Sequence, residues 1–256
     1  MAEAFRLRAA AVTHRGRKRS QNEDCITVGG RIHNESMTAV AVSAHTLDAP
    51  CLCAVADGLG GHAAGEVASR YAIERLLALL PAAYPNAGAA GAALLQINRE
   101  LFAQMRDEPL LQGMGTTVAG VLAGPDGAVV FNVGDSRVYR VSDDGIEQLS
   151  TDDVPQLWVP LFQVPPRTGI LTQCLGGYFE ADKLDPHVER EPVAAQQGYL
   201  LCSDGLYDMV DEADIQSSLG PDLGVSVRSL LEKALVAGGL DNISIVLARI
   251  EPAGDS

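Results

Sequence analysis

Strand-like and helix-like segments come in separate blocks along this chain, and their order restricts the architectures that it can adopt. Apolar runs typical of strands come first, two long helix-like segments follow, and strand-like runs then return before a mixed C-terminal region. A parallel sheet needs a crossover, usually a helix, between consecutive strands, and this chain lacks that regular alternation. The sequence therefore predicts antiparallel sheets with helices packed on their outer faces.

Helical spacing of apolar residues locates the first two helices. Val67, Tyr71, Leu76 and Leu79 recur near a helical period, and Pro81 marks the end of that segment. A second helical pattern follows it, and the runs before both are bounded by Gly, Asn, Asp or Pro, as strands are. We expect strands at 7–13, 25–28, 39–43 and 51–56, and helices at 63–80 and 89–106.

Strand-like runs return after Gly115. The turn sequences GPDG and SDDG separate some of these runs, which we interpret as a meander. Residues 150–168 show no periodicity and contain four prolines and the only tryptophan, so we expect a flap loop of functional importance at about 150–170. The expected strands are 116–122, 129–133, 137–141, 146–149, 188–191, 198–202 and 243–250, and the expected short helices are 206–210, 212–219 and 225–237.

Composition limits the class of protein. The chain has 256 residues, 47% of them hydrophobic, which is enough for a full core, and no linker divides it, so we expect a single domain over 1–256. A formal net charge of −14 argues against unaided binding to nucleic acid or to an anionic membrane. The apolar run at 9–12 is too short for a signal peptide, and no run of about 18 apolar residues occurs. We expect a cytoplasmic monomer.

The cysteines support that compartment. They are odd in number and lie mostly in apolar runs, so we expect reduced, buried thiols. Cys51 and Cys53 form a Cys-x-Cys pair that could belong to a metal site. Both would point to one face of a strand, however, and no second pair follows, which favours a place in the core.

Four apolar runs end or begin beside an aspartate. Asp57 follows CLCAVA, Asp204 follows YLLCS, Asp135 stands between glycine and serine after VVFNV, and Asp241 precedes the run ISIVL. Each alone can be an ordinary turn residue. Together they suggest one site, because strand ends are rigid and adjacent glycine lets a ligand approach closely.

Converging carboxylates repel one another unless protons or cations lie between them. Oxygen ligands suit Mg²⁺ or Mn²⁺, whereas a His/Cys cluster for zinc and a twelve-residue calcium loop are missing. Two such cations about 3.5 to 4 Å apart can activate a water for attack on a phosphate. Arg19 in RSQNEDC offers a guanidinium to grip that phosphate, unless it is an ordinary surface arginine. These features favour hydrolysis of a phosphate ester.

The segments RSQNED, VADGLGGHAAGEVAS, GMGTTVAG, NVGDSRVYR, CSDGLYD and LDNISIV span Arg19 to Val246. With them the chain resembles the metal-dependent serine/threonine protein phosphatases of type 2C in their bacterial form. The resemblance implies an α+β fold, a four-layer α/β/β/α sandwich of two antiparallel sheets flanked by helix pairs. It also implies hydrolysis of phosphoserine and phosphothreonine in proteins, and a cognate serine/threonine kinase or its substrates as partners.

The resemblance also assigns metal ligands, for Mn²⁺ or Mg²⁺ with two ions in the core and possibly a third. Asp57 would bridge the two core ions, and the carbonyl of Gly58 would bind one of them. Asp204 and Asp241 would hold the other ion. Asp135, together with Asp204, resembles the ligands of a third and weaker ion.

Other residues are carried over in different roles. Arg19 would bind the substrate phosphate, and Glu23 and Asp24 would orient waters around the metals. Where animal members have a histidine as candidate general acid, this chain has Leu59, and His62 follows only later. His62 is thus left as an acid, a substrate contact or a polar residue at a helix start.

The flap differs from that of bacterial relatives, which usually have an Asp-His-Ser segment where this chain has Asp153 and Val154. This difference concerns substrate recognition more than hydrolysis. Two other functions were weighed: a catalytically silent module of the same fold that senses a phosphoprotein or a metal, and a nucleotide enzyme. The complete acidic set opposes the first, and the lack of a Gly-rich phosphate loop opposes the second.

Overall fold

The computed structural model describes residues 5–59, 64–80, 85–155, 170–178 and 180–253. Two six-stranded antiparallel sheets form its centre. The first, here called the β1 sheet, consists in spatial order of β11 (Gly145–Gln148), β10 (Arg137–Ser142), β14 (Gly198–Cys202), β15 (Ile243–Pro252), β1 (Phe5–His14) and β4 (Ala41–Thr46). The second, the β5 sheet, consists of β13 (His187–Glu191), β9 (Gly127–Val133), β8 (Val118–Gly124), β5 (Cys51–Ala56), β2 (Cys25–Val28) and β3 (Arg31–His33).

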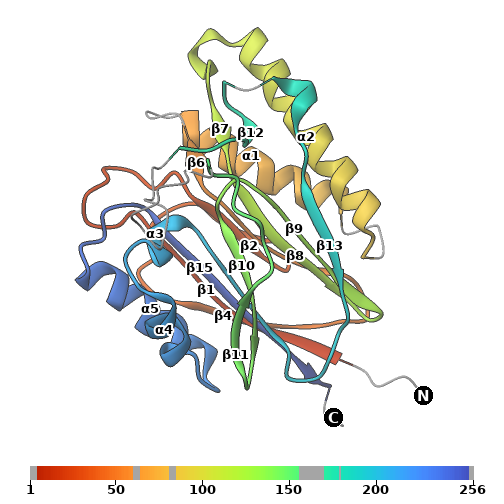
Figure 1. Ribbon diagram of the computed structural model, residues 1–256, viewed down its shortest axis with the longest axis vertical. Coiled ribbons are helices and arrows are strands. Elements are labelled where there is room, and N and C mark those ends of the chain that lie inside the picture. Colours follow the sequence, from red (N-terminus) through yellow and green to blue (C-terminus); the bar gives the residue numbers. More distant parts are fainter. Residues whose placement is uncertain (1–4, 60–63, 81–84, 156–169, 179, 254–256) are drawn as a thin grey trace, which may run out of the picture.

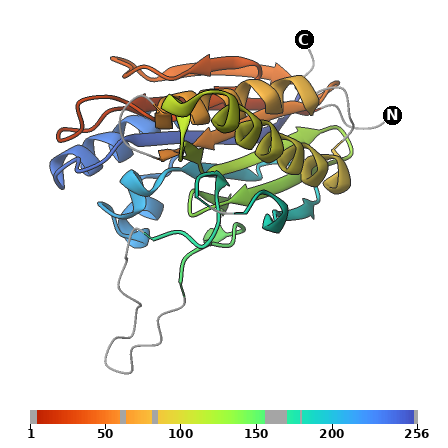
Figure 2. The same ribbon diagram turned by 90° about the horizontal axis from the view of Figure 1, so that it is seen from above.

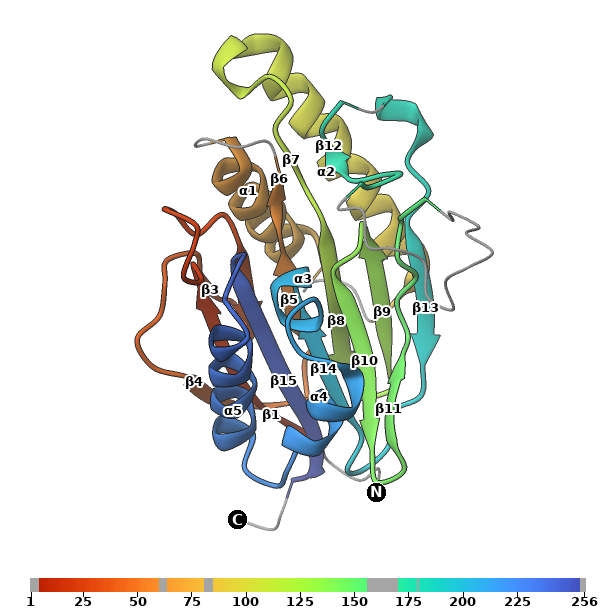
Figure 3. The same ribbon diagram turned by 60° about the vertical axis from the view of Figure 1, so that its left-hand side comes forward.

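Helices cover the outer faces of both sheets (Figures 1 and 3). Helices α1 (Ala64–Leu79) and α2 (Ala87–Asp107) pack on the β5 sheet, and α4 (Glu212–Ser218) and α5 (Leu223–Val236) pack on the β1 sheet. The short α3 (Asp204–Tyr207) follows β14 directly. This arrangement confirms the expected α+β, four-layer α/β/β/α sandwich.

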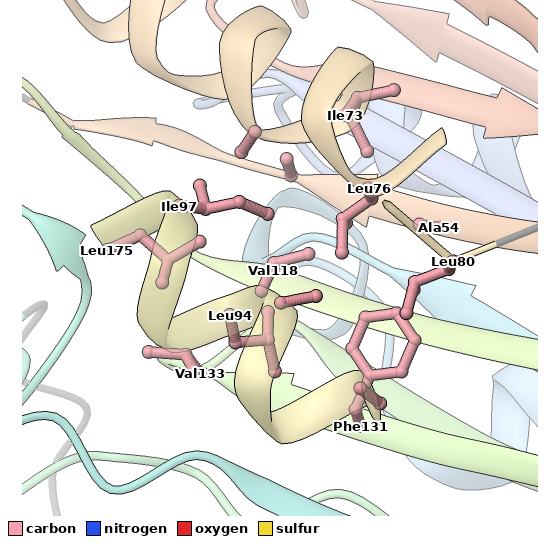
Figure 4. Packing of buried hydrophobic residues seen from close by; sticks show 14 of the residues in the cluster. Ala54, Ile73, Leu76, Leu80, Leu94, Ile97, Val118, Phe131, Val133 and Leu175 are labelled. Atoms are coloured by element: carbon pink, nitrogen blue, oxygen red, sulfur yellow. The ribbon is translucent and has the colours of Figure 1, made fainter. Parts of the chain in front are cut away.

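Three apolar layers hold the four structural layers together. In the outer layer on the β5 sheet, Leu76 of α1 and Ile97 of α2 pack against Val118 and Phe131 (Figure 4). Along β5, alternate side chains enter different layers, because successive residues of a strand point to opposite faces. Ala54 faces the helices, whereas Cys51 and Cys53 lie between the two sheets. All five cysteines are buried and free, as expected.

The expected meander is wrong in one respect. Strands β8 and β9 pair in the β5 sheet, but β10 and β11 belong to the β1 sheet. The chain crosses between the sheets at Gly134, whose φ of +94° is a conformation that favours glycine. Alternation of apolar residues identifies strands but does not say which sheet they join. The apolar pattern of the sequence also did not indicate four very short strands as separate elements: β3, β6 (Gly58–Leu59), β7 (Gly115–Thr116) and β12 (Leu175–Gly176).

Strand pairing fixes where the acidic residues gather. β1 pairs with β15 along its whole length, from Phe5 opposite Pro252 to His14 opposite Ile243. The described chain thus starts and ends on the same side of the molecule, as the first two views show (Figures 1 and 2). The opposite end of the sandwich, at His14, is the end where the candidate site lies.

Candidate active site

Antiparallel pairing brings the expected acidic residues to one end of the sandwich. In the β5 sheet, Ala56 at the end of β5 lies opposite Cys25 at the start of β2, so Asp57 and Asp24 are neighbours. In the β1 sheet, Cys202 at the end of β14 pairs with β15 near its start, which places Asp204 and Asp241 at the same end. Asp135 lies in the crossing from β9 to β10.

The carboxyl groups lie close enough to change one another's ionisation. The pKa of Asp57 is raised well above its ordinary value, first by burial and then by the charges of Asp24, Asp204, Asp135 and Asp241. Asp57 keeps some exposed surface, but protein atoms crowd its carboxyl and displace most of its water. Five acids from distant parts of the chain therefore form one electrostatic neighbourhood.

Three of its members carry large shifts of their own. Burial, followed by the charges of Asp135 and Asp241, raises the pKa of Asp204 to about 8. Burial raises the pKa of Asp24 to about 7, despite hydrogen bonds from two serines. Burial, followed by the charge of Asp152, raises the pKa of Asp135 to about 6. Without cations, this end of the protein would hold protons at neutral pH.

Several observations test whether the residues fit divalent cations. Within the described residues, no three His, Cys, Asp or Glu side chains form a ready-made ligand group. Asp24 Oδ1 and Asp204 Oδ1 are, however, buried without a hydrogen-bond partner in the described part of the chain. A buried carboxylate oxygen rarely lacks a partner, and water or a cation would supply one. The donors are all oxygens, the set that Mg²⁺ and Mn²⁺ prefer, so the residues fit.

Close backbone packing fixes Gly58 beside Asp57. A Cβ on Gly58 would overlap the carbonyl of Gly65 and lie 2.6 Å from the carbonyl oxygen of Glu23. Only glycine lets α1 approach this closely. The resemblance implies a ligand role for the Gly58 carbonyl, and the packing around Gly58 gives a separate reason for glycine at that position.

Threonines hold the backbone of Asp57. Its N–H donates to Thr117 Oγ1 at 3.1 Å, and its carbonyl accepts from Thr116 Oγ1 and from the Thr117 N–H, both at 2.9 Å. Thr117 Oγ1 also hydrogen-bonds Ser136 Oγ at 2.7 Å, next to Asp135. The GMGTT segment therefore ties the two acidic turns together.

A buried hydroxyl network holds Asp24 across the two sheets. Its Oδ2 accepts from Ser244 Oγ at 2.6 Å and from Ser203 Oγ at 2.9 Å. Ser244 Oγ is also hydrogen-bonded to Thr13 Oγ1 at 2.8 Å, and Asn22 donates to the same threonine oxygen at 2.9 Å. Sequence reasoning missed these four partners. The one feature of the sequence that could have indicated them is a short polar side chain within an apolar strand or beside a recognised motif.

Asn242 fastens the RSQNED segment to the start of β15. Its Oδ1 accepts from the Glu23 N–H at 2.8 Å, and its Nδ2 donates to the carbonyls of Gln21 at 2.9 Å and Arg15 at 3.1 Å. The side chain is buried, so these bonds replace water. Ser69 of α1 adds a bond to the Glu23 carbonyl at 2.6 Å. The backbone of Glu23 is thus held by Ser69 of the outer helix α1 and by Asn242 next to the inner strand β15.

Asn242→Ala is expected to lower the free energy of unfolding by about 3 kcal/mol, because it leaves buried backbone groups without partners. Asn86→Ala is the matched control: Asn86 caps α2 by accepting from the Ala89 N–H at an exposed position, so its loss should cost about 1 kcal/mol. Urea unfolding of both variants measures the difference. If both variants lose the same free energy of unfolding, the hydrogen bonds of Asn242 stabilise the fold no more than the exposed helix cap of Asn86 does.

Arg19 lies at the acidic end and is already paired. Its Nη2 is 2.7 Å from Asp241 Oδ2, and both side chains are partly exposed. This hydrogen bond is the main cause that raises the pKa of Arg19. The two residues that the resemblance assigned to phosphate and metal therefore contact each other. His62 and most of the flap, including Trp158, lie outside the described residues.

Comparisons with known proteins agree with this architecture. Residues 31–234 match the family model of Protein phosphatase 2C. The serine/threonine protein phosphatase PstP of Mycobacterium tuberculosis is 34% identical over 256 aligned residues, covering 95% of this chain and 45% of that protein. The chain therefore spans about half the length of that curated relative. The serine/threonine phosphatase stp of Listeria innocua is 32% identical, with 92% of each chain covered.

Solved structures give the same result. The catalytic domain of PstP in complex with two manganese ions superposes with a TM-score of 0.78 at 33% identity, covering 96% of this chain and 99% of that chain.

Proposed function

The chain belongs to the protein phosphatase 2C family, and on that premise we propose that it hydrolyses phosphoserine and phosphothreonine in proteins. The observation that carries the proposal is the crowding of Asp24, Asp135, Asp204 and Asp241 around Asp57. Such an arrangement of acids is costly in the metal-free protein and becomes favourable with divalent cations.

We propose Mn²⁺ or Mg²⁺ as the cofactor. Asp57, the Gly58 carbonyl, Asp204 and Asp241 would hold two ions, and Asp135 with Asp204 a third; the manganese-bound PstP structure supports the first two. Bound cations of this kind supply an activated water and neutralise phosphate charge.

The residues of the chain have separate tasks in this reaction. Asp24, held by Ser203 and Ser244, and Glu23, whose backbone is held by Asn242, would orient waters around the cations. Arg19 exchanges Asp241 for the substrate phosphate, whose oxygens match its guanidinium. A cysteine nucleophile is disfavoured because all five thiols are buried.

The second candidate is a catalytically silent module that senses a phosphoprotein or a metal. The presence of all five acids together supports the enzyme. One assay separates the two: phosphate release from a phosphothreonine peptide with Mn²⁺ and with EDTA. We expect turnover only with the metal. Metal binding without turnover would favour the sensing module, and turnover in EDTA would contradict the metal site itself.

Substrates and compartment are also proposals. We propose that the substrates are phosphoproteins of a cognate serine/threonine kinase, or the kinase itself, and that the protein acts in the cytoplasm as a monomer. Free, buried cysteines suit a reducing compartment. Among the described residues, no helix has the length and apolar character needed to cross a membrane.

Arg19→Ala is expected to lower kcat/KM for a phosphopeptide by about 10- to 100-fold, since a charge-assisted hydrogen bond is worth about 1.5 to 3 kcal/mol. Lys18→Ala is the control, because Lys18 is an exposed cation in the same segment. Steady-state kinetics at saturating Mn²⁺ separates the two variants. Equal rates for both would show that Arg19 acts only through the general charge of the segment.

A further inference from the structure

Each of the three guanidinium nitrogens of Arg137 makes a hydrogen bond. At the start of β10, its Nε lies 3.1 and 3.0 Å from the two carboxylate oxygens of Asp152, and its Nη2 lies 2.6 Å from Asp152 Oδ2. Its Nη1 donates to the hydroxyl of Tyr139 at 2.9 Å. Gln148 also donates to Asp152, at 2.8 Å. The guanidinium is thus fixed in one orientation and its charge is neutralised.

Tyr207 links this fixed group to the acidic site. The Cζ of Arg137 lies 3.8 Å from the centre of the Tyr207 ring, a stacked cation–π contact. The hydroxyl of Tyr207 donates to the backbone carbonyl of Asp135 at 2.9 Å. Tyr207 is also the last residue of α3, which begins at Asp204. One buried side chain therefore connects the helix that carries Asp204 with the turn that carries Asp135.

We propose that Arg137 and Tyr207 are positioning residues that set the spacing of Asp135 and Asp204, and thereby the affinity for a divalent cation held between these two carboxylates. The inference rests on the proposed metal-dependent function. Neither residue contacts the cation in this scheme: the tyrosine hydroxyl fixes the Asp135 backbone, and the stacked guanidinium fixes the ring.

Electrostatics alone predicts the opposite result for Arg137. Removing a positive charge, and leaving Asp152 without its partner, makes the neighbourhood more negative and should tighten cation binding. If Arg137 instead acts by positioning Asp135 and Asp204, its loss should weaken cation binding. Arg137→Gln therefore distinguishes the two explanations by the sign of the change.

Two tyrosines provide a matched pair. Tyr139 and Tyr207 are both buried, and both contact Arg137. Of these two tyrosines, only Tyr207 donates a described hydrogen bond to Asp135. Phenylalanine removes one buried hydroxyl in either case, so the cost in stability should be similar, about 1 kcal/mol. A merely structural role predicts that the two variants behave alike.

The experiment is a calorimetric titration of Mn²⁺ into the wild type, Tyr207→Phe, Tyr139→Phe and Arg137→Gln, each checked for folding by circular dichroism. We expect the dissociation constant of the weakest Mn²⁺ site to rise about tenfold in Tyr207→Phe and in Arg137→Gln, and to change far less in Tyr139→Phe, where Asp152 still holds the guanidinium. In the phosphopeptide assay, Tyr207→Phe should release phosphate more slowly than the wild type. This difference in rate should become smaller as the Mn²⁺ concentration increases.

Unchanged Mn²⁺ binding in Tyr207→Phe, equal weakening in both tyrosine variants, or tighter binding in Arg137→Gln would overturn the inference. A wild type that binds no Mn²⁺ would overturn it together with the proposed function. A wild type that binds Mn²⁺ but releases no phosphate would remove the proposed function only, because the calorimetric comparison needs no substrate.

Discussion

Asp57→Asn is expected to lower phosphate release from a phosphothreonine peptide by about 10³-fold and to abolish the rise in Tm that Mn²⁺ produces. Asp57, as a proposed ligand of the core cations, would supply charge to them, and such cations contribute several kcal/mol of transition-state stabilisation. Asparagine keeps the shape of the side chain and its place at the end of β5, so the backbone bonds to Thr116 and Thr117 should survive.

The same substitution should make the metal-free protein more stable. Asp57 is the group whose pKa is raised by burial and by all four neighbouring acids, so a neutral side chain there removes repulsion. Asp126→Asn, in the exposed turn between β8 and β9, is the control and should change neither quantity. Kinetics and thermal unfolding with and without Mn²⁺ measure both effects. A variant that keeps its Mn²⁺ response would rule out Asp57 as a ligand.

The regular apolar pattern predicted antiparallel sheets with helices on their outer faces, and the family resemblance implied the four-layer sandwich. The segments at 25–28, 51–56 and 198–202 match β2, β5 and β14 residue for residue, since apolar runs with sharp polar ends leave little choice of boundary. The exchange of sheets at Gly134 was missed, because a tight turn and a crossing between sheets have similar local sequences. Sheet membership depends on long-range pairing, which one sequence does not display.

The acids of the site were predictable for a related reason. Asp57 and Asp204 interrupt apolar runs next to glycine, so each one is visible locally. The hydrogen bonds that hold these acids in place were not predictable from the sequence. Ser203 and Ser244 look like ordinary polar residues until the fold brings them to Asp24. Likewise, the Arg19–Asp241 pair joins residues from the two ends of the sequence, and only the β1–β15 pairing makes that contact possible.

The metal-free protein is expected to lose stability as pH rises from 6 to 8. Burial raises the folded-state pKa of Asp204 to about 8 and of Asp24 to about 7, whereas the unfolded chain has ordinary carboxyl values near 3.8. Within this window the folded state binds more protons than the unfolded state, so the free energy of unfolding falls as pH increases. The loss should be roughly 4 kcal/mol, about 8 to 16 °C in Tm.

Saturating Mn²⁺ should remove most of this slope, because cations then replace protons among the carboxylates. The rise in Tm on adding Mn²⁺ should therefore be larger at pH 8 than at pH 6. Asp204→Asn tests the assignment: without metal, its Tm should depend less on pH than that of the wild type, since one of the carboxyl groups with a raised pKa is gone. Thermal unfolding at several pH values, in EDTA and in Mn²⁺, measures all of these quantities. A metal-free Tm that stays constant or rises between pH 6 and 8 would contradict the mutual repulsion of the acids on which the proposed site depends.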